Sequence, residues 1–347
     1  MNLSTYASRA MGLAASAIGG LLFTVLGVPL GWILGAMFGS AVYANIFGID
    51  GKTRNIRRSG QLLIGVATAG VLTPDILNTI IGLLPAMIAA ALAANVIGLA
   101  FAWPLGKMAG IDRMTALLSS LPAGMAEMSS LAKEVGARAD IVTIVHTLRV
   151  IIVVLMVPAL IATTTINPVT SETSSGTYAA LLLCLIGGLV LAIGATRLNL
   201  LNPFIIMPMV LGPIFVAAGF PIARMPDSLL IAAQIFIGFS LGARLRREGF
   251  LKLPRAALAG LICGTALVAM MVFVIAPLIA LWTGSDLTSV MLGTAPGGLG
   301  EMIASAKVVG ASAAIVAGFQ FVRSFLTNMI VPPLIIRVGK PNNGGHA

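Results

Sequence analysis

Residues 122–128 read PAGMAEM, and residues 296–302, 174 positions further along the chain, read PGGLGEM. Each copy places a single carboxylate, Glu127 or Glu301, in an otherwise apolar stretch. The same offset pairs Lys133 with Lys307, His146 with Gln320 and Arg149 with Arg323. A repeat of this length predicts that two similar structural units follow one another along the chain.

The composition is typical of a protein embedded in a membrane. Hydrophobic residues make up 58% of the 347 residues and charged residues only 9%, and the mean hydropathy is +1.04. These values exclude an ordinary soluble domain. Apolar stretches close to the 20 or so residues that span a bilayer occur at 9–27, 28–48, 77–103, 140–165, 178–196, 203–220, 256–282 and 312–336, with shorter ones at 59–72 and 228–243. We therefore expect an all-α polytopic membrane protein whose main partner is the lipid bilayer.

The net charge of +10 comes mostly from lysines and arginines in short loops between apolar stretches. Basic residues in such loops set the orientation of spans, so we expect no nucleic-acid partner. The basic segment 244–255, RLRREGFLKLPR, fits contact with anionic lipid head groups, although a role in anchoring the topology is simpler. Cys184 and Cys263 lie within apolar stretches, which predicts no disulfide framework, no metal site and no cofactor.

A polar segment at 163–177, TTTINPVTSETSSGT, interrupts the apolar pattern between the two copies. We therefore divide the chain into a first membrane repeat (1–166), a polar linker (167–177) and a second membrane repeat (178–347). The correspondence extends beyond the acidic motif, because Gln61 and its neighbours resemble the segment at Gln234, and Pro29 lies 174 residues before Pro203.

The basic residues also predict how the repeats are oriented. With five spans per repeat, and with segments 114–133 and 288–307 re-entering the side they came from, 17 of the 21 lysines and arginines face the cytoplasm. If those segments cross fully, the loops divide into 10 inside and 9 outside. The first arrangement predicts two inverted repeats, both termini in the cytoplasm, and two acidic hairpins whose tips approach each other near the membrane midplane.

Five residues in the two motifs are predicted to break the helix just before each acid: Pro122, Gly124, Pro296, Gly297 and Gly298. Half-helix ends of this kind can coordinate ions or small polar solutes. We therefore interpret Glu127 and Glu301 as carriers of a coupling proton or cation. The alternative is that each acid only caps a broken helix or pairs with a nearby arginine.

Further candidates lie on the apolar stretch that follows each motif. If the helices begin near residues 140 and 312, a rise of about 1.5 Å per residue places Arg149 and Arg323 roughly 13 to 17 Å deep in a core about 30 Å thick. They would neutralise the acids, bind an anionic solute or form a structural ion pair.

The remaining polar candidates are a histidine and three glutamines. His146 and Gln320 lie three residues before the arginines, on the same helix face. His146 would relay protons or only donate and accept hydrogen bonds. Gln61 and Gln234 would line a cavity or bond across helices. A glycine stripe at 27, 31, 35 and 39 indicates close packing, within the chain or in a homo-oligomer.

The duplicated PxGxxEM segments, the arginine-bearing span after each and the chain length together resemble the AbrB-type membrane protein family. Members are named as ammonia monooxygenases or as membrane regulators of gene expression, and the family's layout is similar to that of secondary transporters with inverted repeats. Oxygenation by copper or iron needs a cluster of ligands, whereas this chain has two histidines, His146 and His346. Direct control of transcription would need a DNA-binding element that the sequence lacks.

The sequence thus favours a multi-pass protein of the inner (plasma) membrane that acts as a secondary transporter for a small solute or ion. The alternative is a membrane regulator or sensor that does not transport and acts on gene expression through a partner. That alternative predicts that the basic segment 244–255 matters more than the acids. We expect no enzymatic activity, and a membrane enzyme ranks third.

Overall fold

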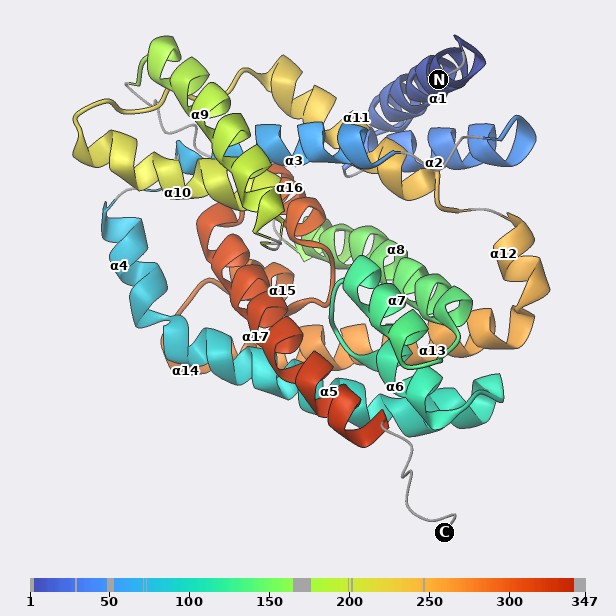
Figure 1. Cartoon of the computed structure of the whole chain (residues 1–347). Coiled ribbons are helices and arrows are strands. Elements are labelled where there is room, and N and C mark those ends of the chain that lie inside the picture. Colours follow the sequence, from blue (N-terminus) through green and yellow to red (C-terminus); the bar gives the residue numbers. More distant parts are fainter. Residues whose placement is uncertain are drawn as a thin grey trace.

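The computed structural model describes residues 3–28, 30–48, 53–70, 72, 74–164, 176–198, 200, 202–245 and 247–339, and these residues form an all-helical protein (Figure 1). The first half contains α1 (Leu3–Val25), α2 (Gly31–Ile46), α3 (Arg54–Ala69), α4 (Pro74–Gly82), α5 (Leu84–Ala109), α6 (Arg113–Ser120), α7 (Met125–Glu134) and α8 (Ala139–Thr164). The second half contains α9 (Tyr178–Arg197), α10 (Pro203–Ala217), α11 (Asp227–Gly242), α12 (Arg247–Lys252), α13 (Pro254–Met270), the π-helical turn η1 (Met271–Ile275), α14 (Ala276–Thr283), α15 (Leu287–Thr294), α16 (Leu299–Val309) and α17 (Ala313–Gly339).

Six helical segments in the described residues are long and apolar enough to cross a membrane, which makes this a multi-span membrane protein. They are Ala7–Val25, Leu84–Ala109, Ala139–Ile161, Tyr178–Arg197, Pro254–Thr283 and Ala313–Val331. Three more predicted stretches are shorter apolar helices, Gly31–Ile46, Pro203–Ala217 and Asp227–Gly242. At about 1.5 Å per residue these are shorter than a bilayer core of about 30 Å.

The helices form two layers (Figure 1). We call α1, α2, α3, α9, α10 and α11 the panel layer, because these helices pack chiefly against one another. We call α5 to α8 and α13 to α17 the hairpin layer, because it contains both interrupted segments. Among the described hairpin-layer helices, α16 makes the most extensive contacts with panel helices, against α3 and α11.

Small residues allow the panel helices to approach closely. At Gly19, Gly35 and Gly39 a Cβ atom would collide with backbone across the α1–α2 contact. Lipid tails are as apolar as leucine, so helices in a membrane associate through close packing of this kind. The glycine stripe was predicted to allow close packing either within the chain or in a homo-oligomer. At Gly35 and Gly39 the close packing is within the chain.

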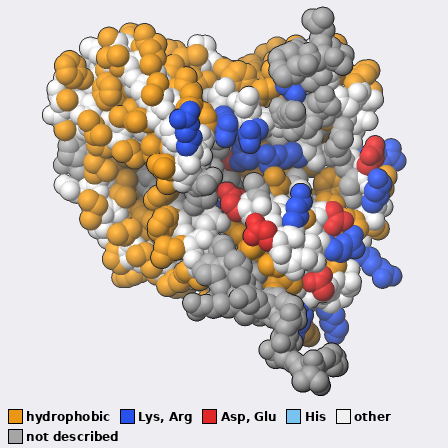
Figure 2. All heavy atoms as spheres, in the orientation of Figure 1, with side chains coloured by type: hydrophobic (Ala, Val, Ile, Leu, Met, Phe, Trp, Pro, Cys, Tyr) orange, Lys and Arg blue, Asp and Glu red, His pale blue; other side chains and the backbone are white. Residues whose placement is uncertain are grey.

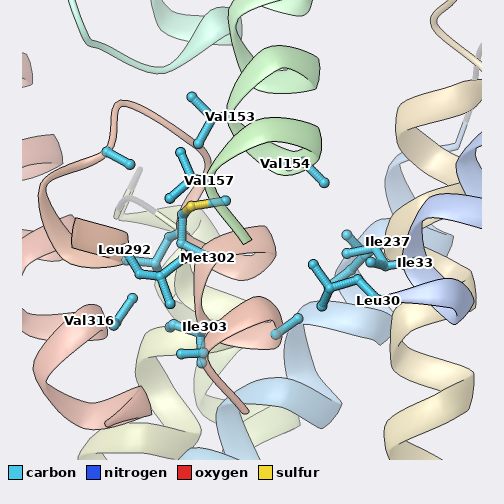
Figure 3. Packing of buried hydrophobic residues seen from close by; sticks show 14 of the residues in the cluster. Leu30, Ile33, Val153, Val154, Val157, Ile237, Leu292, Met302, Ile303 and Val316 are labelled. Carbon is cyan, nitrogen blue, oxygen red and sulfur yellow. The ribbon is translucent and has the colours of Figure 1, made fainter. Parts of the chain in front are cut away.

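An apolar cluster holds the two layers together (Figure 3). Leu30, Ile33 and Ile237 come from the panel layer, and Val157 and Met302 come from the hairpin layer. Met302, the last residue of the second motif, is fully buried against α8 and α15. Met128 occupies a second cluster in the same way, so each motif is anchored by the methionine that follows its acid.

The two interrupted segments are helical hairpins with matching caps. Asp112 accepts a 2.8 Å hydrogen bond from the backbone N–H of Thr115 at the start of α6, and Asp286 accepts one of 2.8 Å from Ser289 at the start of α15. Although burial raises the pKa of Asp112, the hydrogen bonds from the Thr115 hydroxyl and amide lower it below its usual value. Such N-caps satisfy amides that have no partner within the helix.

Some sequence predictions lie outside the described residues. These are Pro29, residues 167–175 of the linker, residue 246 of the basic segment and His346. The last linker residue, Thr177, donates its backbone N–H to the carbonyl of Pro221 at 3.0 Å, just before α9.

Candidate functional site

A cavity of about 160 Å3 lies between the two layers, and both chain breaks open into it. Residues 123–125 line it from the first hairpin and residues 297–299 from the second. α8 and α17 contribute His146, Arg149 and Arg323, and the panel layer contributes Arg57 and Arg244. Charged side chains gather near the middle of the face in Figure 2, whereas α9 and α10 present hydrophobic side chains. The cavity therefore brings together predicted residues of both repeats.

Arg149 and Arg323 cap the C-terminal ends of α6 and α15, the first half-helices of the two hairpins. Arg149 donates to the carbonyls of Leu121 at 2.8 Å and Ala123 at 3.2 Å. Arg323 donates to the equivalent carbonyls, those of Ala295 at 2.6 Å and Gly297 at 2.7 Å. The carbonyls just beyond α6 and α15 have no intrahelical partner and lie at the negative end of the helix dipole. Backbone carbonyl oxygens therefore offset the positive charges of the two guanidinium groups, which are buried among apolar helices.

His146 and Gln320 make the same two hydrogen bonds despite their different chemistry. The Nε2 atom of His146 is 2.8 Å from the carbonyl of Leu118, and its Nδ1 atom is 3.0 Å from Arg149. Gln320 donates to the carbonyl of Leu292 at 2.9 Å and accepts from Arg323 at 2.6 Å. Because a carbonyl and a guanidinium face its two nitrogens, His146 is neutral with its proton on Nε2. This arrangement favours hydrogen bonding over the proton relay.

The spacing between glycine and glutamate in the motif has a steric explanation. Gly124 and Gly298 are the N-caps of α7 and α16, and both have negative φ angles. A Cβ atom on either glycine would collide with the carboxylate of Glu127 or Glu301, which folds back over the helix N-terminus. A carboxylate at the positive end of the helix dipole is stabilised there. The glycine is therefore needed for space, not for its backbone angles.

The two acids differ sharply in their surroundings. Glu301 is fully buried, and its Oε1 accepts a 2.8 Å ion-pairing hydrogen bond from Arg57 of α3. Its other oxygen, Oε2, has no hydrogen-bond partner among the described residues. Glu127 is exposed and lines the cavity. The ion-pair partner of Glu301 is thus Arg57 and not Arg323, which was one of the predicted partners.

A second polar contact ties α16 to the panel layer. Lys307 Nζ donates to the carbonyl of Ala67, near the end of α3, at 3.0 Å. Lys133, the equivalent residue on α7, is exposed. The second hairpin is therefore held at both ends of α16, whereas α7 packs mainly on α6 and α8.

The remaining predicted residues take smaller parts. Pro122 and Pro296 are buried within the two breaks. Gln61 is buried beside Gly300 and donates to Asn202 at the long distance of 3.5 Å. Gln234 is half-buried on α11 and is not among the described residues that line the cavity.

Sequence reasoning missed Arg57, Arg244 and Asn202 as cavity residues. The sequence predicts only a topology-setting role for Arg57 and Arg244. Asn202 is the N-cap of α10 and has a φ of 46°, a left-handed conformation that asparagine tolerates better than most residues. Its position directly before Pro203 was the signal that could have revealed it.

Comparison with known proteins places the whole arrangement in a family. The model of the family described as "Transition state regulatory protein AbrB" matches residues 51–339. The "Uncharacterized protein YhjN" of Bacillus subtilis is 27% identical, with 92% of this chain and 90% of that protein aligned. The "Putative regulator AbrB" of Escherichia coli is 24% identical, with 91% of each chain aligned. The chain therefore belongs to the AbrB family of membrane proteins.

Proposed function

We propose that the protein is a secondary transporter of the inner membrane, built from two inverted repeats, that moves a small solute or ion. The observation that carries the proposal is that two chain breaks, one from each half, open into a single polar cavity between two helix layers. Discontinuous helices that meet near the midplane are the usual site of substrate and coupling ions in such transporters.

Matched hydrogen bonds support the duplication. The contacts of Arg149 and Arg323 with backbone carbonyls, and those of His146 and Gln320, recur at an offset of 174 residues. The helix caps at Asp112 and Asp286 follow the same offset. Since side chains and caps correspond as well as motifs, a common ancestor of the two halves explains the pattern.

The difference between the hairpins supports alternating access. α16 is packed on α3 and α11, while Glu127 at the start of α7 is exposed to the cavity. In inverted-repeat transporters, alternating access is largely a movement of one repeat or bundle against the other around a fixed site. We infer that here the two hairpins alternate between a packed and a released position. In this proposal the exposed Glu127 takes up the coupling proton or cation, and Glu301 does so when α16 leaves α3.

The test is whether one cavity residue can be reached from both sides of the membrane. Ser324 lines the cavity and would become Ser324→Cys in a chain whose Cys184 and Cys263 are replaced by alanine. A membrane-impermeant thiol reagent is applied to right-side-out and to inside-out vesicles. A transporter exposes the introduced cavity thiol to both sides in turn, whereas Arg197→Cys, an exposed control at the end of α9, reacts from one side only.

The second candidate function is a membrane regulator, which the name of the Escherichia coli relative suggests. A regulator that does not transport keeps its cavity open to one side. Labelling of the cavity thiol from a single side of the membrane would therefore favour the regulator and contradict the transporter. An enzymatic role ranks third, and copper, iron or zinc in the purified protein would revive it.

A further inference from the structure

The cavity carries an excess of positive charge. Its lining includes four arginines, Arg57, Arg149, Arg244 and Arg323, and one carboxylate, Glu127. Even when the buried Glu301 beside Arg57 is included, four guanidinium groups face two carboxylates. Backbone carbonyls offset the charges of Arg149 and Arg323 only in part. The formal excess of positive charge remains and is costly inside a membrane protein, so a bound solute that supplies one or two negative charges would stabilise this site.

The four arginines differ in their hydrogen-bond and ion-pair partners. Arg149 and Arg323 are bound to backbone carbonyls, and Arg57 is paired with Glu301. Arg244, in the turn after α11, is not ion-paired within the part of the chain that the structure describes. It makes a weak contact, 3.8 Å from a terminal guanidinium nitrogen to the sulfur of Met125. Arg244 is therefore the guanidinium most available to a solute.

The surrounding groups favour the same charge. Arginine presents a planar fork of donors that matches the two oxygens of a carboxylate or phosphate. A cation would instead meet four positive side chains.

The cavity volume limits the size of the solute. A water molecule takes about 30 Å3 in the liquid. A cavity of about 160 Å3 therefore has the volume of roughly five waters. Only a small solute fits into it.

We propose that this cavity binds a small oxyanion with one or two negative charges and that Arg244 is its principal contact. That this anion is the transported solute rests on the proposed function, but its binding does not. The sequence assigns anion binding to Arg149 and Arg323 as one alternative. The structure moves the contact to Arg244, since the other two guanidinium groups are occupied by backbone.

The first test measures the charge preference of the cavity without knowledge of the natural solute. The Ser324→Cys chain is treated with anionic sulfonatoethyl methanethiosulfonate and with its cationic trimethylammonium counterpart. Each rate is divided by the rate with free 2-mercaptoethanol. We expect the corrected rate to favour the anion on the order of tenfold, because the arginine field concentrates anions.

Matched variants then assign the preference to one residue. Arg244→Gln should lower the anion-to-cation ratio at least threefold, whereas Arg247→Gln, an exposed arginine of α12, should leave it unchanged. A ratio of one or less in the parent overturns the proposal. So does a cavity thiol that reacts with neither reagent in the folded protein but reacts after denaturation.

A second test identifies the oxyanion class. The uncharged reagent N-ethylmaleimide is used to label the Ser324→Cys thiol in the presence of sodium succinate or sodium phosphate, against sodium chloride of equal ionic strength. Slower labelling with succinate supports a carboxylate, and slower labelling with phosphate supports a phosphate. Protection by neither contradicts the proposal.

The outcomes separate this inference from the transporter proposal. Anion preference with labelling from one membrane side keeps the anion site and rejects transport. Labelling from both sides without anion preference keeps transport and rejects the anion site.

Discussion

Glu127 and Glu301 occupy the same position in two copies of one motif, yet one is exposed to a cavity and the other is buried beside Arg57. A buried carboxylate remains charged at low cost only if a partner and a helix N-terminus compensate it. Glu301 has both, because it lies in the first turn of α16 and pairs with Arg57. The packing around each motif, not the motif itself, therefore decides whether its acid is buried and ion-paired.

We predict strong energetic coupling between Arg57 and Glu301. Arg57→Gln leaves the buried Glu301 carboxylate without its partner. The change should lower the free energy of unfolding by about 2–3 kcal/mol, less than for a fully buried pair, because the Arg57 side chain is 24% exposed. Adding Glu301→Gln should recover most of that loss. The free energy of unfolding in mixed micelles is the measurement, with the exposed Arg54→Gln as control. Simple additivity of the two changes would contradict the pairing.

The N-cap glycine leads to a second prediction at this scale. Gly298→Ala introduces a Cβ atom where the Glu301 carboxylate lies, so it should destabilise the protein by about 1–3 kcal/mol. In a Glu301→Ala background the same change should cost much less. Gly194→Ala on α9 is the control, since nothing lies within 4 Å of a Cβ there. An equal cost of Gly298→Ala in both backgrounds would show that the carboxylate does not occupy this space.

At the scale of single elements, each hairpin combines two half-helices whose ends carry opposite partial charges. Arginine donates to the carbonyls beyond the first half-helix, and glutamate folds over the N-terminus of the second. This arrangement explains why an acid and an arginine recur 22 residues apart in both halves. A broken helix at membrane depth needs these compensating groups, because water is not freely available there.

His146 and Gln320 occupy equivalent positions in the two halves, which leads to a third prediction. His146→Gln should cost less than about 1 kcal/mol of stability, because glutamine makes both bonds at the equivalent site in the second hairpin. His146→Leu should cost about 1–3 kcal/mol, since Leu118 and Arg149 lose a partner. The labelling of the Ser324→Cys thiol from both sides is measured alongside unfolding. Loss of access from one side in His146→Gln, with stability unchanged, would instead support a proton relay.

The sequence was sufficient to predict the two chain breaks and several residues around the cavity, among them Arg149 and Arg323, but not Arg57, Arg244 or Asn202. An offset of 174 residues located both breaks, and a helical spacing of three placed His146 and Arg149 on one face. The partner of Glu301 could not be predicted, because Arg57 lies 244 residues away and contacts it only through the packing of α16 on α3. The different exposure of the two similar motifs could not be predicted either, since it depends on how each hairpin packs against the panel layer.

At the scale of the whole molecule, the two layers meet through an apolar cluster and through α16. Two polar contacts, Arg57 with Glu301 and Lys307 with Ala67, fasten α16 to α3. If the protein transports, these contacts must break and re-form in every cycle. A link that makes them permanent should hold the protein in one conformation.

Gln61 and Gly300 offer such a link. A Cβ atom on Gly300 would lie 3.4 Å from Cγ of Gln61, a separation compatible with a disulfide. The chain carrying Gln61→Cys, Gly300→Cys and Ser324→Cys, without Cys184 and Cys263, should therefore cross-link on mild oxidation. The disulfide consumes two thiols, so the thiol at position 324 is the one left to label. Failure to cross-link would contradict the packing of α16 on α3.

The two-sided labelling of position 324 in this chain, before and after reduction of the disulfide, tests the central claim most directly. We predict that the oxidised protein is labelled from one side of the membrane only. After reduction, labelling at position 324, identified by its peptide mass, should occur from both sides. Equal labelling from both sides in the fully cross-linked protein would contradict the claim that α16 moves relative to α3 during transport.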